Sequence, residues 1–324
     1  MSTVAEVADV LRGADSLALA CHHHPDGDAL GSMLAMHLLC AEHDKPSVAS
    51  WPSPWTVAPH YRFLPGLDRC TPPEQFPTEP EVLVTFDLGN VGRLGDLAPA
   101  VEGAGHVVVL DHHPDNQRFG SLNLVDETAA ATAVLVRQLA TELDWALTRD
   151  VALNLYVGLV TDTGRFRYPN TTPDVFHLAE ELAEYDLPIA RITRELFEKH
   201  RFQYVQLLSM ALARTELDPS RGFVVAWLTQ ADLDDFDVTF DETEGFIDHV
   251  RACQEAEVAC VLRESAGEGL RVSLRSTGSI DVSELAAHFG GGGHTFMAGF
   301  ATDRPIPEIV EAIRSRLPER TMSA

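Results

Sequence analysis

The sequence has few basic residues and no long hydrophobic runs. Lysine and arginine number 24 against 49 aspartates and glutamates, which gives a net charge of −25 at pH 7. An acidic surface repels a long phosphate backbone, so we expect no long duplex DNA as a partner. No stretch reaches the roughly 18 to 20 apolar residues of a membrane helix, and the N-terminus lacks a basic start before an apolar core. We therefore expect no membrane partner and a cytoplasmic location.

Cysteine is also sparse. The five cysteines are widely separated and form no CxxC pair, which favours reduced, buried thiols over a disulfide framework. None of them is a candidate nucleophile. The composition, with 45% hydrophobic and 23% charged residues over 324 positions, is that of a globular protein rather than a disordered one, and its length suggests two domains at roughly 150 residues each.

The first half alternates short apolar runs with helical patterns, which is typical of an α/β fold with a mainly parallel sheet flanked by helices. Runs such as VLVTF and VVVL are of the buried-strand type. We predict strands at 16–21, 82–86 and 107–110, helices at 29–42, 130–143, 149–160 and 174–185, and a Pro-rich loop at 51–80.

The second half predicts a smaller C-terminal α/β domain. The stretch 188–218 reads as one long or broken helix and is predicted to link a domain at 1–187 to a domain at 219–324. In the second domain we predict strands at 222–228, 258–264 and 269–275, and helices at 242–253, 282–289 and 307–317.

Acidic and histidine side chains follow each predicted strand of the first domain. The loop after the first strand reads HHHPDGDALGS and contains His22, Asp26 and Asp28; Asp87 follows the second strand, and DHH follows the third at 111–113. Histidine and carboxylate at such spacing are typical metal ligands. Because the carboxyl ends of parallel strands line one crevice, these clusters should meet in space. Asp162, between two glycines, is a further candidate.

These motifs, with TDTGRFRYPNTT at 161–172 and GGGGH at 290–294, resemble the DHH/DHHA1 phosphoesterases over nearly the whole chain. Within that superfamily they most resemble the bacterial oligoribonucleases that also dephosphorylate 3′-phosphoadenosine 5′-phosphate, and their cyclic-dinucleotide-degrading relatives. The resemblance implies a DHH catalytic domain, a DHHA1 substrate-binding domain and two divalent metal ions, of which Mn²⁺ is the expected species. One ion would be held by His22 and Asp26, the other by Asp28, His112 and Asp162, with Asp87 bridging both.

The resemblance also implies roles around the metals. A water between the two ions would attack phosphorus, and His113 would face the phosphoryl group as a hydrogen-bond donor or proton-transfer group. Asp111 would orient its neighbouring histidine. Candidates for substrate contact near the metals are Arg93, Asn116, Arg165 and Arg167.

In the second domain, the resemblance implies that a terminal phosphate and nucleoside are held by Arg275, Gly292, Gly293 and His294. A glycine run can bring backbone N–H groups against phosphate. A helix beginning near His294 would add its positive end. Phe296 would either stack on a base or pack in the core.

The leading prediction is a two-metal phosphohydrolase that acts on short RNA and on 3′-phosphoadenosine 5′-phosphate. A cyclic-dinucleotide phosphodiesterase using the same site is the main alternative. An inorganic pyrophosphatase is disfavoured because the glycine-rich domain suits a nucleoside, and a repair exonuclease because of the charge. A non-catalytic nucleotide sensor would not need six metal ligands. Relatives are commonly dimers, so a homodimer is considered, although no interface signature is visible.

Overall fold

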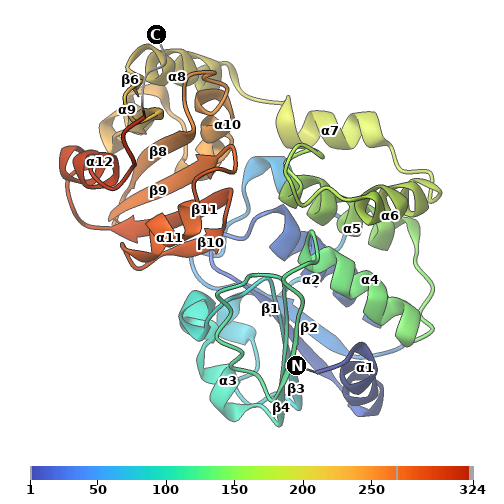
Figure 1. Cartoon of the computed structure of the whole chain (residues 1–324). Helices are drawn as coiled ribbons and strands as arrows, with labels where there is room; N and C mark the ends of the chain where they lie inside the picture. Colours follow the sequence, from blue (N-terminus) through green and yellow to red (C-terminus); the bar gives the residue numbers. More distant parts are fainter. Residues whose placement is uncertain (1, 268, 321–324) are drawn as a thin grey trace. The chain divides into compact units, whose positions relative to one another are not determined.

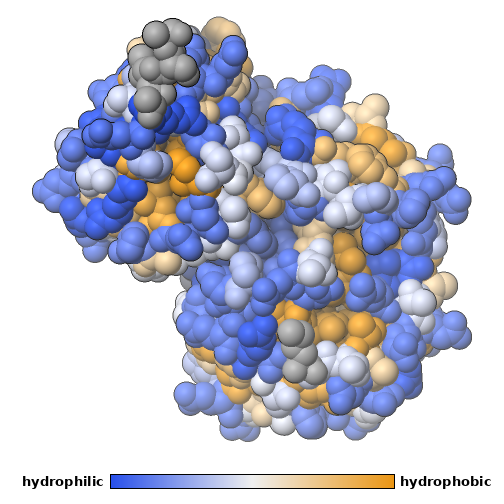
Figure 2. All heavy atoms as spheres, viewed as in Figure 1, coloured by the Kyte–Doolittle hydropathy of each residue, from blue (hydrophilic) through white to orange (hydrophobic). Residues whose placement is uncertain are grey.

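The computed structural model describes residues 2–267 and 269–320. The chain forms two compact units, Met1–Leu196 and Phe197–Ala324. Both combine helices with a sheet (Figure 1), which confirms the predicted α/β class. Hydrophilic residues cover most of the face seen in Figure 2.

The first unit is built on a parallel sheet of five strands in the order β2-β1-β3-β4-β5. Every neighbouring pair in it is parallel. The carboxyl ends of all five strands therefore lie at one edge, where polar side chains can converge. The strands are β1 (Leu17–Cys21), β2 (Ser47–Ser50), β3 (Val82–Phe86), β4 (His106–Asp111) and β5 (Leu122–Val125).

Helices cover both faces of this sheet. One face packs against the 3-10 helix η4 (Val91–Leu97) and α3 (Pro99–Gly103). The other packs against α2 (Gly27–Glu42), whose residues 27–40 are all buried, as expected for a helix that is apolar on every side. The remaining helices of the unit are α1 (Val4–Gly13), α4 (Thr132–Glu142), α5 (Arg149–Asp162), α6 (Pro173–Ala183) and α7 (Ile189–Phe197).

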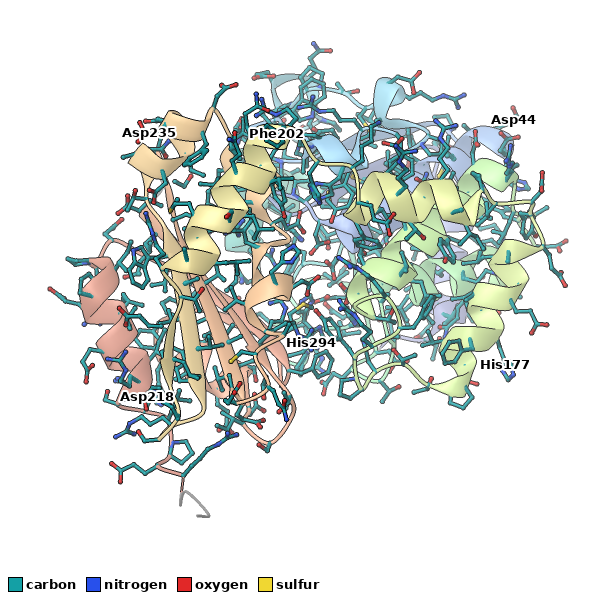
Figure 3. All side chains as sticks on the ribbon, turned by 90° about the horizontal axis from the view of Figure 1, so that it is seen from above. Asp44, His177, Phe202, Asp218, Asp235 and His294 are labelled. Atoms are coloured by element: carbon teal, nitrogen blue, oxygen red, sulfur yellow. The ribbon has the colours of Figure 1, made fainter. Side chains whose placement is uncertain are left out.

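The second unit has a six-stranded sheet in the order β10-β11-β9-β8-β7-β6. Only β7 and β8 pair in parallel. Helices pack on both faces. Figure 3 marks Phe202 at the start of its first helix and His294 at the end of β10. The elements are α8 (Phe202–Ala213), β6 (Glu216–Asp218), β7 (Phe223–Leu228), α9 (Gln230–Phe236), α10 (Phe246–Val250), β8 (Val258–Ser265), β9 (Gly269–Ser276), α11 (Val282–Ala287), β10 (Gly292–His294), β11 (Met297–Thr302) and α12 (Ile306–Arg314).

The stretch predicted as a helical linker, 188–218, is broken and does not stay helical to its end. It forms α7, α8 and then the strand β6. Helix α7 lies almost wholly in the first unit, whereas α8 belongs to the second, because Tyr204 and Leu207 pack into the same core as Phe246.

The predicted helix near His294 is wrong. Residues Gly292–His294 instead form β10, which pairs antiparallel with β11. Gly293 has φ +135°, and a Cβ there would lie 2.5 Å from the carbonyl oxygen of Met297. The glycines therefore allow a close hairpin rather than a helix start.

The sequence predicts reduced cysteines and no membrane-spanning helix. All five cysteines are free thiols. Within 2–267 and 269–320, no helix is both long and apolar enough to cross a membrane.

Candidate metal centre

The carboxyl edge of the parallel sheet gathers the acidic and histidine side chains. His22 follows β1, Asp87 follows β3, and Asp111 ends β4 directly before His112. Two helices add the other groups. Asp26 and Asp28 lie at the start of α2, and Asp162 is the last residue of α5. The structure thus brings together all six predicted ligands, although they are scattered over 140 positions of the chain.

The first cluster contains His22, Asp26 and Asp87, whose ligand atoms all lie within 4.8 Å of one another. The His22 ring is buried, and its Nδ1 lies 2.9 Å from the carbonyl oxygen of His23. Because a carbonyl only accepts, Nδ1 carries the proton and Nε2 keeps its lone pair. That lone pair faces Asp26 Oδ2 at 3.8 Å and Asp87 Oδ2 at 3.6 Å.

The second cluster contains Asp28, Asp87 and His112, again within 4.8 Å. His112 is fixed like His22, since its Nδ1 lies 3.0 Å from the carbonyl oxygen of Ala129. Its Nε2 faces three carboxylates: Asp162 Oδ2 at 3.1 Å, Asp87 Oδ1 at 3.5 Å and Asp28 Oδ2 at 3.8 Å.

Asp87 belongs to both clusters. Its two carboxylate oxygens face different histidines, Oδ2 toward His22 and Oδ1 toward His112. Its backbone has φ +58°, a left-handed conformation that a residue other than glycine seldom adopts. The Asp87 N–H donates to Leu110 O at 3.0 Å, which fixes the turn directly after β3. Such strain at a buried carboxylate is common at functional sites.

These arrangements fit divalent ions. Two ligands about 2.1 Å from the same octahedral ion lie roughly 3 Å apart when adjacent and about 4 Å apart when opposite. The separations of 3.1 to 3.8 Å around the two Nε2 atoms fall in this range. Nε2 of His22 is also buried without a hydrogen bond. Imidazole with several carboxylates suits a transition-metal ion.

The electrostatics of the metal-free chain point the same way. Burial, with Asp87 and Asp162 nearby, raises the pKa of Asp28 well above its usual value. Burial lowers the pKa of His112, but Asp162 and Asp87 outweigh it, so that this pKa is raised well above the usual value. In the absence of metal, protons therefore compensate the crowded carboxylates. Cations would take their place, so metal affinity should fall as the pH is lowered.

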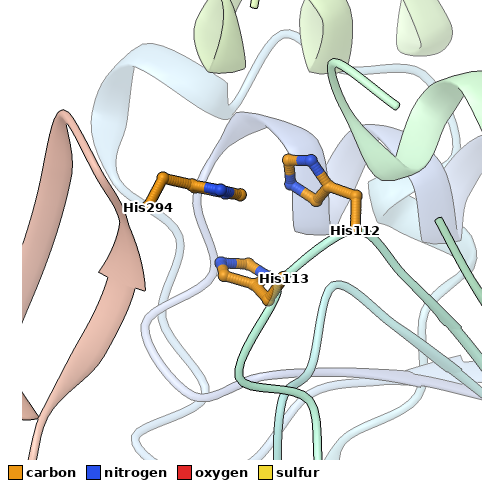
Figure 4. Close-up of side chains that lie close together, drawn as sticks. All are labelled: His112, His113 and His294. Carbon is orange, nitrogen blue, oxygen red and sulfur yellow. The ribbon is translucent and has the colours of Figure 1, made fainter. Parts of the chain in front are cut away.

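His113 lies beside the two clusters and has a different partner. Its Nδ1 lies 2.7 Å from Asp111 Oδ1, and its ring packs edge to face with that of His112 at 5.0 Å between centroids (Figure 4). Asp111 is fully buried, and its Oδ1 also accepts the backbone N–H of His112 and of His113. This carboxylate therefore orients the His113 ring through its contact with Nδ1.

The structure departs from the prediction that Asn116 contacts substrate. Asn116 is buried, and its amide donates to Leu88 O at 3.0 Å and to Asp111 Oδ2. Its Oδ1 accepts the Arg118 N–H. Because its amide oxygen and nitrogen are occupied within the protein, Asn116 holds Asp111 in place.

The predicted arginines of the first unit lie near the clusters. Arg93 is half-buried in η4, and its carbonyl accepts the His23 N–H at 3.0 Å. Burial and the charge of Arg93 lower the pKa of His22, but Asp26 and Asp87 outweigh them, so this pKa is raised from its usual value. Arg165 is half-buried in the turn that follows Asp162. Arg167 is exposed, and its Nε donates to Gly164 O at 2.7 Å.

The backbone after Asp162 is unusual. Gly164, Arg165 and Phe166 have φ values of +55°, +64° and +59°, which is a left-handed turn containing two residues other than glycine. The Phe166 ring stacks on that of Phe176 from α6, with centroids 5.5 Å apart. Arg165 therefore lies in a left-handed turn three residues after Asp162.

In the second unit the predicted substrate residues share one region of the sheet. Met297 of β11 is paired with Arg275 on one side and with His294 on the other, so the three side chains lie on one face of the sheet. Gly292 and Gly293 complete β10. Arg271, four residues before Arg275 on β9, lies on the same face and was not among the predicted residues, because only its period-two spacing from Arg275 points to it.

Comparisons with known proteins agree with this structure. Residues 16–159 match the DHH family, N-terminal domain, and residues 221–319 match the DHHA1 domain. The chain is 32% identical to the Bifunctional oligoribonuclease and PAP phosphatase NrnA of Thermus thermophilus, over 98% of this chain and 94% of that protein. It is 27% identical to the protein of the same name from Bacillus subtilis, over 88% of each.

A solved structure of an exopolyphosphatase-related protein from Bacteroides fragilis has the same fold. It superposes with a TM-score of 0.86 at 22% identity, covering 96% of this chain and 94% of the other. The RecJ structure from Thermus thermophilus with Mn²⁺ has a TM-score of 0.55 at 15% identity and covers 98% of this chain and 55% of RecJ. With its near full-length relative above 30% identity and both domain models matched in order, the chain belongs to the DHH family and carries a C-terminal DHHA1 domain.

Proposed function

We propose that this chain is a metal-dependent phosphohydrolase that degrades very short oligoribonucleotides and dephosphorylates 3′-phosphoadenosine 5′-phosphate. The observation that carries the proposal is Asp87, which points one oxygen at each of two histidine-containing clusters. The names of the near full-length relatives from Thermus and Bacillus support the substrate class.

Two divalent ions, with Mn²⁺ as the proposed species, complete the site. His22, Asp26 and Asp87 would hold one, and Asp28, Asp87, His112 and Asp162 the other. When bound, the ions supply Lewis acidity and an activated water for attack on phosphorus. The protein contributes the positions of the ligands, since both histidines are fixed by bonds to backbone carbonyls.

His113 supplies a proton at the phosphoryl group. Burial lowers its pKa, but the carboxylates of Asp111 and Asp87 raise it to about 9. The ring is therefore charged at neutral pH in the metal-free chain, with Nδ1 held by Asp111. Asp111, which is not a proposed metal ligand, favours the charged ring through its bond to Nδ1, and Nε2–H of that ring donates to a phosphoryl oxygen or protonates the leaving group.

The second unit binds the rest of the substrate. Arg275 and His294 lie on one face of its sheet, on either side of Met297, and arginine pairs well with phosphate. Gly292 and Gly293 form β10 with His294, and Gly293 allows the close hairpin that pairs His294 with Met297. We further propose a cytoplasmic location, in keeping with five free thiols.

The test is product analysis with Mn²⁺ on a dinucleotide, 3′-phosphoadenosine 5′-phosphate, a cyclic dinucleotide, pyrophosphate and a long RNA. We expect mononucleotides from the dinucleotide faster than from the long RNA, and phosphate from the bisphosphate. The control Asp87→Ala should be inactive on every substrate. Preference for the cyclic dinucleotide or for pyrophosphate, or equal rates on short and long RNA, would refute the proposed substrate class.

A further inference from the structure

The segment Ala129–Ala133, which precedes and begins α4, contains no metal-binding side chain, yet it touches the second cluster at several points. Its residues from 130 to 133 are buried, and Thr132 is fully so. The contacts come from the backbone as well as from one hydroxyl. Together they reach Asp28, Asp87 and His112 directly, and Asp162 through Asn170.

Asp28 is held by the N-terminus of α4. The N-cap residue Ala131 has no side chain that could cap the helix. Instead, Asp28 Oδ2 accepts the N–H of Thr132 at 2.5 Å, and Oδ1 accepts the N–H of Ala133 at 3.0 Å. A carboxylate at a helix N-terminus satisfies free N–H groups and is favoured by the helix dipole. This carboxylate comes from 104 residues earlier in the chain.

Asp87 is held by the side chain of the same residue. Thr132 Oγ1 lies 3.1 Å from Asp87 Oδ1, the oxygen that faces His112. A carboxylate only accepts, so the hydroxyl donates. One threonine thus fixes two ligands, Asp28 through its backbone and Asp87 through its side chain.

The same segment also reaches His112 and Asp162, the other two proposed ligands of the second ion. The carbonyl of Ala129 accepts Nδ1–H of His112. The amide of Asn170 donates to the carbonyls of Ala130 and of Asp162, at 3.0 and 3.2 Å. All four proposed ligands of the second ion are therefore connected to five consecutive residues.

We infer that residues 129–133 position the ligands of the second ion, with Thr132 as the positioning residue that joins Asp28 to Asp87. The inference rests on the proposed two-metal function. Without the hydroxyl, Asp87 Oδ1 loses the hydrogen bond from Thr132 and can turn away from His112. The first cluster uses the other carboxylate oxygen of Asp87, Oδ2, which Thr132 does not contact. The second ion should then bind more weakly while the first is little affected.

The test is calorimetric titration of Mn²⁺ into the full chain, comparing Thr132→Val, which removes only the hydroxyl, with Thr132→Ser, which restores it. Loss of such an orienting contact typically costs about 10- to 100-fold in metal affinity. We expect that loss for one of two sites in Thr132→Val and near-parental affinity in Thr132→Ser. Thr141→Val, on the exposed side of the same helix, is the matched control and should bind as the parent does.

A second variant and a kinetic readout separate positioning from general damage. Asn170→Ala should weaken the same site, because it removes the amide that bonds to the carbonyls of both Asp162 and Ala130. In both variants the Mn²⁺ concentration for half-maximal activity should rise, while kcat at saturating Mn²⁺ returns close to that of the parent. If the parent binds no pair of ions, the proposed function fails. If the parent binds two and both variants bind them equally well, or if serine does not rescue, this inference fails.

Discussion

Gly158 on α5 is the position where one added methyl group should disturb the metal centre most. A Cβ there would lie 2.6 Å from Asp28 Oδ1, 2.9 Å from the Cβ of Ala133 and 3.4 Å from the Cα of Asp28. The carboxylate cannot simply rotate away, because it is fully buried and accepts hydrogen bonds from Ser32, Thr132 and Ala133. Gly158→Ala must therefore move α5 away from α2 and α4 or break the cap on α4.

The magnitude follows from opposing terms. Alanine in a helix is favoured over glycine by about 1 kcal/mol. Overpacking a buried site costs about 1–3 kcal/mol, and a lost helix cap costs about 1 kcal/mol. The net loss is about 1–3 kcal/mol in the free energy of unfolding. At roughly 2–4 °C per kcal/mol for a unit of this size, a loss of about 2 kcal/mol lowers Tm by roughly 4–8 °C.

The assay is thermal unfolding of the metal-free chain, followed by Mn²⁺ titration, with Gly13→Ala as the matched control. Gly13 ends α1, and a Cβ there meets nothing within 4 Å, so this variant should be as stable as the parent or slightly more stable. Gly158→Ala should melt lower and bind one Mn²⁺ more weakly. If Gly158→Ala matched Gly13→Ala in both measurements, the close approach of α5 would not be what holds Asp28.

Two further predictions concern His113 and the second unit. The pKa of His113 is about 9 in the folded metal-free chain and about 6.5 in the unfolded chain. The charged ring therefore stabilises the fold fully below pH 6.5, and this stabilisation is lost as the pH rises through 9. Unfolding measured across this range should show the loss, and Asp111→Asn should reduce it; identical slopes would contradict the assignment. His294→Ala should raise KM for 3′-phosphoadenosine 5′-phosphate with Mn²⁺ affinity unchanged, and an altered Mn²⁺ affinity with an unchanged KM would argue against a substrate-binding role.

The sequence predicted best the strands with a regular apolar pattern, which is continuous in β3 and β4 and alternating in β9. The strands β3 and β4 are short, continuous apolar runs, and their ends lie within one residue of the predicted limits. The edge strands β2 and β5 were missed because SVAS and LNLV are only four residues long and mix polar with apolar residues. Their strand conformation comes from pairing with β1 and β4, which is a tertiary effect that local patterns do not report.

The glycine run at 290–293 was misinterpreted, and the packing role of the glycines after β1 was not predicted. The four glycines at 290–293 suggested that a helix begins after them, but in the structure Gly293 allows a close hairpin between β10 and β11. In HHHPDGDALGS, by contrast, the glycines have a packing role. A Cβ at Gly31 would lie 2.5 Å from Asn154 O of α5. The motif therefore contains two ligand carboxylates and also a residue that lets α2 and α5 approach closely.

The sequence located the proposed ligands but not the groups that orient them, and the reason is chemical. A ligand must be a histidine or a carboxylate, so its residue type is visible in the sequence. Most of the groups that orient these ligands are backbone groups, namely the carbonyls of His23 and Ala129 and the N–H groups of Thr132 and Ala133, which any residue could supply. The side-chain exceptions are the Thr132 hydroxyl and the Asn170 amide. What distinguishes TAAATA at 128–133 is the small size of its side chains, because bulkier ones would hold the backbone away from the carboxylates. The positions of the ligands therefore depend on how closely α2, α4 and α5 pack. A bulkier residue in the segment 128–133 should disturb metal binding although it alters no ligand.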